Sequence, residues 1–193
     1  MKNIFFTFLS LVLTLFVVSC ATETPATPDD YIKVIESYSA GDVEYVGAYN
    51  HFNFRSTLMN TIIQNAVIDR KAALYLWDDI KKQQELGSMQ ADNASMTKVF
   101  MSFYTPDRRN DNLSTPKTIW ALYLETPNGR YTGTAKRVRT NPTELMTLYP
   151  SHNRFTTAYN VEFPVALASV EGQKLKLTIT GPLGTRSVEF VPK

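Results

Sequence analysis

Residues 174–191 read KLKLTITGPLGTRSVEFV, and this stretch decides the fold. Leu175, Leu177 and Ile179 alternate with Lys and Thr, a period of two that predicts a strand with one buried face. A GPLG turn follows, and the alternation resumes in SVEFV. The stretch therefore predicts an antiparallel hairpin whose apolar side chains face a core.

Four segments upstream are rich in β-branched and aromatic residues and also predict strands. They cover residues 97–104, 118–125, 131–139 and 159–167. The second of these is apolar on both faces, as is typical of a central strand. Pro164 in the last one predicts an edge strand or a bulge. A short helix is predicted over residues 141–148, because a Pro stands in its first turn.

These strands predict an α+β chain that is mainly β, in which residues 96–193 form an antiparallel β-sandwich. We expect an immunoglobulin-like or jelly-roll-like sandwich, and an incomplete barrel is the alternative. Of the 193 residues 44% are hydrophobic and 20% are charged. That composition can bury a core, so one globular domain is predicted over residues 31–193.

Residues 31–56 are predicted to form an extended arm ahead of the sandwich. Residues 31–38 and 43–54 are rich in β-branched and aromatic side chains, which favour strands. The turn signal Ala-Gly-Asp separates the two runs. The arm is therefore expected to supply one or two strands.

One long α-helix is predicted over residues 57–85. Apolar side chains recur there every three or four positions, no Gly or Pro interrupts them, and Gly87 offers a stop. Such a helix spans roughly 42 Å, whereas a strand of typical length spans only roughly 20 Å. The helix should overhang its sheet, so we expect Trp77 in a covered contact and Arg70 where the apolar surface changes partner.

Charge and cysteine content exclude several classes of protein. The formal charge is +2, which gives no electrostatic reason to expect a nucleic-acid partner. The single cysteine, Cys20, excludes an internal disulfide framework and a multi-cysteine metal site. GxGxxG and P-loop patterns are absent from the sequence, so no cofactor is expected.

Residues 1–20 read MKNIFFTFLSLVLTLFVVSC, in which one Lys precedes about fifteen mostly apolar residues, a secretory signal pattern. The run is shorter than the roughly 20 residues of a transmembrane helix. Its end, VVSC, resembles the lipobox of bacterial lipoproteins. The resemblance implies a signal peptide over residues 1–19, cleavage before Cys20, and thioether lipidation of Cys20 that anchors the chain in a membrane.

The residues after the lipobox bear on the expected location. Residues 20–30 are mostly small and polar, with two Pro, and predict a flexible tether. Ala21 stands where an Asp would favour the inner membrane in the enteric lipoprotein pattern. The resemblance therefore implies the outer membrane, with the domain in the periplasm. An ordinary signal peptide with an incidental Cys and an uncleaved membrane anchor are the alternatives.

The loop DRRNDN, residues 107–112, concentrates oxygen ligands of the kind that bind Ca²⁺. Asp107, Asn110 and Asp111 are its candidate ligand contacts. Two arginines in the same loop and the absence of EF-hand spacing oppose a metal site. Asp and Asn also favour turns for the backbone bonds that they make themselves, so no metal is predicted.

Lys136, Arg137 and Arg139 form the densest basic cluster. On a strand, Lys136 faces one side and the two arginines face the other. The cluster either meets anionic lipid headgroups or acidic cell-wall sugars, or it only keeps an edge strand soluble.

No catalytic motif such as GxSxG or HExxH occurs in the sequence. His51 and His152 are the only side chains that ordinarily titrate near neutral pH. We expect a non-enzymatic binding or scaffolding domain, anchored to a bacterial membrane through Cys20, with an envelope protein or the cell wall as partner. An envelope hydrolase that uses His51 or His152 is one alternative. A carrier of a lipid or small apolar ligand, with the helix as a lid, is another.

Overall fold

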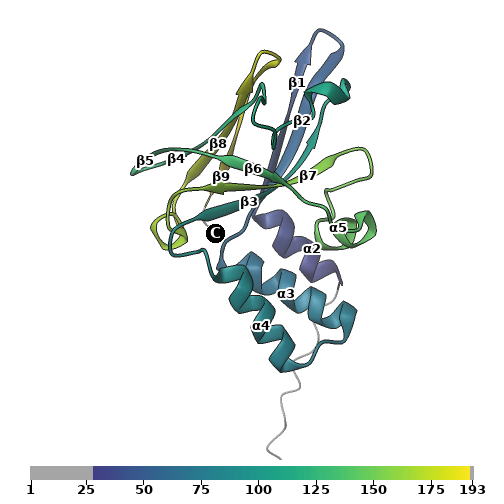
Figure 1. Ribbon diagram of the computed structural model, residues 1–193, viewed down its shortest axis with the longest axis vertical. Helices are drawn as coiled ribbons and strands as arrows, with labels where there is room; N and C mark the ends of the chain where they lie inside the picture. Colours follow the sequence, from purple (N-terminus) through teal and green to yellow (C-terminus); the bar gives the residue numbers. More distant parts are fainter. Residues whose placement is uncertain (1–27, 192–193) are drawn as a thin grey trace, which may run out of the picture.

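The computed structural model describes residues 28–191. The predicted signal peptide, Cys20 and most of the predicted tether lie outside the described residues. Within residues 28–191 the chain is mainly β, with two antiparallel sheets and four α-helices. The sheets occupy one end of the long axis and most of the helices occupy the other (Figure 1).

The described strands form one five-stranded and one four-stranded sheet, and every pairing is antiparallel. The first has the order β1 (Ser39–Val46), β2 (Tyr49–Leu58), β3 (Thr97–Tyr104), β7 (Thr157–Phe163) and β6 (Thr134–Arg137). The second has the order β5 (Gly129–Thr132), β4 (Ala121–Thr126), β8 (Leu175–Gly181) and β9 (Gly184–Phe190). The helices are α2 (Pro28–Ser37), α3 (Thr61–Tyr75), α4 (Asp79–Gln90) and α5 (Pro142–Leu148), with 3₁₀ turns η2 (Arg108–Asn110) and η3 (Leu167–Ser169).

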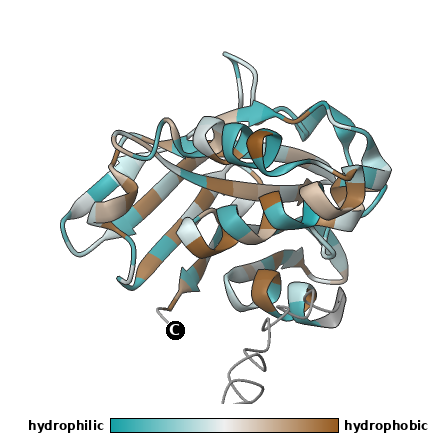
Figure 2. Ribbon diagram, turned by 90° about the horizontal axis from the view of Figure 1, so that it is seen from below, coloured by the Kyte–Doolittle hydropathy of each residue, from teal (hydrophilic) through white to brown (hydrophobic). Residues whose placement is uncertain are grey.

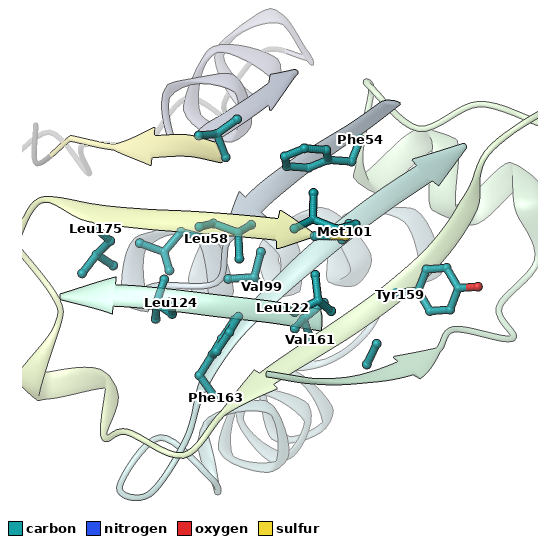
Figure 3. Packing of buried hydrophobic residues seen from close by; sticks show 14 of the residues in the cluster. Phe54, Leu58, Val99, Met101, Leu122, Leu124, Tyr159, Val161, Phe163 and Leu175 are labelled. Atoms are coloured by element: carbon teal, nitrogen blue, oxygen red, sulfur yellow. The ribbon is translucent and has the colours of Figure 1, made fainter. Parts of the chain in front are cut away.

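The main hydrophobic core lies between the two sheets. The predicted terminal hairpin is confirmed, because β8 pairs with β9 and Leu175, Leu177 and Ile179 are fully buried. They belong to one cluster with Val99 and Met101 of β3, which come from the other sheet (Figure 3). Hydrophobic and hydrophilic residues alternate along the strands (Figure 2), as expected for strands with one buried face.

The predicted strand 131–139 is divided, because the chain changes sheets at Gly133. A Cβ atom at Gly133 would lie 2.6 Å from Cε1 of Phe163 and 2.9 Å from Cγ1 of Val161. Only a glycine therefore allows the backbone to approach β7 so closely as it passes from β5 to β6.

The predicted strand 97–104 is confirmed as β3, and the predicted short helix as α5. Of the two alternatives predicted from Pro164, an edge strand or a bulge, the edge strand was wrong, because β7 lies between β3 and β6. That strand ends at Phe163. Pro164 follows it in a bend, where its missing N–H removes no ladder hydrogen bond.

The strand predicted over residues 31–38 was wrong, because these residues belong to α2 apart from the last. Pro28 opens the helix, where its fixed backbone angle is favourable. Tyr31 and Ile35, one helical turn apart, are both buried. The helical spacing of the large apolar residues thus outweighed the β-branched composition.

The single helix predicted over residues 57–85 was also wrong. Residues 57 and 58 end β2, and the remainder forms two helices, α3 and α4. The break lies at Leu76, whose backbone is left-handed with φ 52°, and Gly87 lies inside α4 instead of ending it. No described helix is both long and apolar enough to cross a membrane.

Both helices begin at a side-chain cap. The side chain of Asn60 accepts a hydrogen bond from the N–H of Ile63 at 2.9 Å. The side chain of Asp78 accepts one from the N–H of Lys81 at 2.7 Å. Asp78 is the signal for a new helix that the periodic pattern concealed.

Helices α2, α3 and α5 cover part of the outer face of the five-stranded sheet. Their apolar side chains form a second core with Phe100 and Ala158. Arg70 meets α2 there, with its guanidinium carbon 5.5 Å from the ring centre of Tyr31. Trp77 is only half-buried, and its ring stacks on that of Tyr75 with the ring centres 5.9 Å apart. The covered contact predicted for Trp77 is therefore only partly present.

Candidate functional site

A pocket of about 470 Å³ lies between α5 and the segment that leads into β7. Arg137 and Arg139 line it from the end of β6 and the residues after it, and Arg154 lines it from the segment before β7. No Asp or Glu is among its described lining residues, and none of these arginines forms an ion pair with another described residue. Three arginines that line one hollow suit a phosphate or a carboxylate.

His152 also lines this basic pocket, and two hydroxyl groups contact its Nδ1 atom. Its Nδ1 lies 2.8 Å from Oγ of Ser102 and 3.0 Å from Oγ1 of Thr156. Thr156 donates to the carbonyl of Asn153 at 2.9 Å, so Ser102 donates to Thr156 at 2.7 Å. With these two directions both hydroxyl protons are used, and Nδ1–H of His152 is then the donor to Ser102, with Nε2 as an acceptor.

The protonation of His152 is coupled to its surroundings. The ring is buried and lies edge-on to Phe100, with centroids 6.0 Å apart. Burial lowers the pKa of His152, so the ring is neutral at neutral pH. An anion bound beside it would raise that pKa, because opposite charge favours the protonated form.

Neither histidine is arranged as a general base for a serine. The proton of Ser102 is directed to Thr156, whereas a general base would have to accept it. Nδ1 of His51 lies 3.2 Å from the carbonyl of Leu183, a contact in which the ring can only donate. Within the described residues, no group of three His, Cys, Asp or Glu is placed to hold a metal ion.

The candidate ligands of the loop after β3 already have partners within the protein. Asp107 pairs with Arg109 at 2.7 Å, and its hydrogen bonds with Arg109 lower the pKa of the Asp107 carboxyl. Asp111 accepts from the hydroxyl of Tyr159 at 2.8 Å and from a threonine hydroxyl. The carbonyl of Asn110 accepts from an indole N–H. The contacts of Asp111 and Asn110 fasten the loop to the rest of the fold, whereas that of Asp107 stays within the loop.

The basic cluster separates, but strand alternation does not explain this, because β6 ends at Arg137 and Val138 also lines the pocket. Lys136 is not a lining residue of the pocket and pairs with Glu162 of β7 at 2.7 Å. Arg137 and Arg139 line the pocket. Lys136 therefore contributes to the sheet surface, and the two arginines are the members that remain available to a ligand.

A second hollow of about 380 Å³ adjoins the basic pocket and shares Asn153 and Thr156 with it. Arg55 lines this hollow, and its buried Nε atom has no hydrogen-bond partner among the described residues. Gly41 lies beside it, where a Cβ would come within 3.1 Å of Cα of Arg55. The second hollow therefore adds one arginine next to the basic pocket, together with one carboxylate, Asp42.

Sequence reasoning missed Arg55, Arg154 and the position of His152 at the pocket. They come from β2 and from the segment between α5 and β7, and no spacing in the sequence links them. The only available signal was the pair Arg137 and Arg139, which was identified without its neighbours. Comparison with known proteins adds no relative, since no family model, curated protein or solved structure matches the chain.

Proposed function

We propose that this protein is a non-enzymatic, lipid-anchored binding domain of the bacterial envelope that holds an anionic ligand in the basic pocket. The observation that carries the proposal is the convergence of Arg137, Arg139 and Arg154 on a hollow without a lining carboxylate. Each arginine can bind a phosphate or carboxylate through two parallel hydrogen bonds. The ligand class is therefore an anionic lipid headgroup or an acidic cell-wall sugar.

The proposed anchor is Cys20, in the outer membrane and facing the periplasm. It is supported by the signal-like run that ends in VVSC and by the polar residues that follow. The envelope partner is a cell-wall polymer or a protein that bears such an anionic group. The finer fold assignment, an immunoglobulin-like or jelly-roll-like sandwich, is part of this proposal and is supported by the core shared between the two sheets.

The two alternatives have less support. A hydrolase is favoured by the 2.8 Å approach of Ser102 to His152, but the hydrogen bonds there run in the wrong direction for proton abstraction. A carrier of an apolar ligand needs a mainly apolar cavity, whereas charged and polar side chains line the basic pocket.

Titration calorimetry with glucuronate and with inorganic phosphate tests the pocket. The Arg139→Gln/Arg154→Gln variant should lose most of the binding seen with the unaltered protein, because two of its three guanidinium groups are gone. Lys117→Gln is the matched control, since Lys117 is an exposed cation outside the pocket lining. Equal binding by both variants, or no binding of either probe by the unaltered protein, would refute the proposed site.

Metabolic labelling with a fatty acid tests the anchor. The unaltered protein should be labelled, and Cys20→Ala should lose the label and remain uncleaved. Ser10→Ala, inside the apolar run, should be labelled normally. An unlabelled wild-type protein would contradict the lipid anchor.

A further inference from the structure

The turn between α3 and α4 presents apolar side chains to solvent. Leu76 is 90% exposed and Ile80 is 77% exposed, and Leu74 and Tyr75 beside them are about half exposed. We call these four residues the helical tip. Large apolar side chains grouped on a surface mark a contact site more often than scattered ones do.

The backbone of the helical tip is unusual as well. Leu76 is the only residue other than glycine with a positive φ in the described chain. A left-handed backbone is costly for a leucine, and glycine or asparagine is the usual residue at such a helix end. A strained backbone that exposes an apolar side chain does nothing for the stability of the isolated fold, so it points to a function.

The helical tip lies at the end of the domain where the tether enters. The N–H of Leu58, just before α3, donates to the carbonyl of Tyr38, just after α2. Near the other end of α3, Arg70 lies against Tyr31 in the first turn of α2. The two helices are therefore antiparallel, and Pro28 begins α2 beside the end of α3 that carries the helical tip (Figure 1).

The chain before α2 is short. Pro28 lies eight positions after Cys20, and a chain of eight residues reaches at most about 28 Å. A lipid on Cys20 would hold the beginning of α2 within that distance of the bilayer surface. Even a weak contact between the helical tip and lipid would then be favoured, because it becomes intramolecular.

We infer that the helical tip docks on the surface of the bilayer that holds the anchor, with Leu76 and Ile80 inserted at the level of the headgroups and upper acyl chains. This inference rests on the proposed lipid anchor. Residues 69–85 contain four acidic and four basic side chains, so their formal charges cancel. The docking therefore depends on apolar insertion and does not require anionic lipid.

Tryptophan quenching tests the docking on the full lipidated protein in phosphatidylcholine vesicles with bromine on the upper acyl chains. Trp77 adjoins the helical tip, and the other tryptophan, Trp120, is buried between the sheets. The vesicles should quench the unaltered protein more than Trp77→Phe. Leu76→Asn/Ile80→Asn should lose this extra quenching, and its melting temperature should not fall, because Asn adopts the left-handed backbone more readily than Leu.

Tyr45→Asn/Tyr49→Asn is the matched control, because it removes exposed apolar surface at the opposite end of the molecule. It should keep the extra quenching. The docking would be overturned if the unaltered protein were quenched no more than Trp77→Phe, or if the two double variants lost quenching equally. It would also be overturned if quenching required phosphatidylglycerol in the vesicles. A labelled but unquenched protein would keep the anchor and refute the docking. Quenching of an unlabelled protein by added vesicles would support the docking and refute the anchor.

Discussion

The α3–α4 turn and the β1–β2 turn lie at opposite ends of the molecule (Figure 1), and each carries exposed apolar side chains. One is the helical tip. The other is the turn of the β1–β2 hairpin, where Tyr45, Val46 and Tyr49 are all more than half exposed, and we call it the β tip. In the β tip the positive φ belongs to Gly47, whereas in the helical tip it belongs to Leu76. Exposure is thus similar at the two ends, but only the helical tip combines it with backbone strain.

The most exposed side chains of the two ends, Tyr49 on one side and Leu76 and Ile80 on the other, also differ in chemistry. Tyr45 and Tyr49 carry hydroxyl groups that hydrogen-bond with water, so the β tip is compatible with a solvated end. Leu76 and Ile80 carry no polar atom beyond the backbone. Exposed apolar area alone therefore does not identify a docking surface. The two ends differ in the backbone strain at Leu76 and in their distance from the start of α2, where the tether joins.

The largest expected effect on the free energy of unfolding comes from a change in the core, outside both tips. It gives a reference against which the effects at the two tips can be compared. Leu177→Ala should lower the free energy of unfolding by about 2–5 kcal/mol, the usual cost of a cavity at a fully buried leucine. Chemical denaturation measures it, with Lys176→Ala on the exposed face of the same strand as the control. If Leu177→Ala lowers the free energy of unfolding no more than Lys176→Ala does, Leu177 does not lie on the buried face of β8.

Exchanging the residue types at the two turns should change stability in opposite directions. Leu76→Gly should raise the free energy of unfolding, and Gly47→Leu should lower it, each by about 1 kcal/mol, because a left-handed backbone suits glycine. No neighbour lies within 4 Å of a Cβ at Gly47, so strain and not a clash is tested there. If both changes lower the free energy of unfolding equally, the backbone at Leu76 is not more strained than the backbone at Gly47.

A smaller effect concerns the pH dependence of stability, which should differ between the two ends of the molecule. The pKa of His152 is lower in the folded chain than in the unfolded chain, because the ring is buried. Below the unfolded value of 6.5 the unfolded chain therefore binds more protons. Stability should fall as the pH is lowered from about 7 to about 5, and His152→Gln should weaken this dependence.

Hydrogen exchange locates the pH effect. His152 packs against Phe100, which also belongs to the core under the helices. Acidification should therefore speed exchange around α3 and α5 more than around the β1–β2 turn. Equal acceleration at both ends, or an unchanged pH dependence in His152→Gln, would contradict the assignment.

The sequence predicts regular elements best where one period dominates. Residues 174–191 show uninterrupted alternation, and β8 and β9 follow from it. Residues 57–85 show helical spacing, but that spacing cannot reveal a break at Leu76, because a left-handed leucine is contrary to local preference. Only the cap at Asp78 marks the second helix.

The basic pocket could be predicted only in part, for a different physical reason. Arg137 and Arg139 are close in the sequence, so the end of β6 and the residues directly after it bring both to the pocket. Arg154 and Arg55 reach the same face through the packing of α5, β2 and β7. The buried hydrogen-bond chain from His152 to Ser102 joins residues 50 positions apart, a separation over which local pattern carries no information.

The central claim is that a lipidated Cys20 and the helical tip together hold one end of the molecule against the bilayer. Cys20 is the only cysteine, so labelling with a water-soluble maleimide on vesicles can compare Ile80→Cys with Tyr49→Cys in otherwise unaltered, lipidated protein. The account predicts that wild type does not react, that Ile80→Cys is protected, and that Tyr49→Cys reacts fully. A reactive wild-type thiol, or equal reaction at positions 49 and 80, would contradict it.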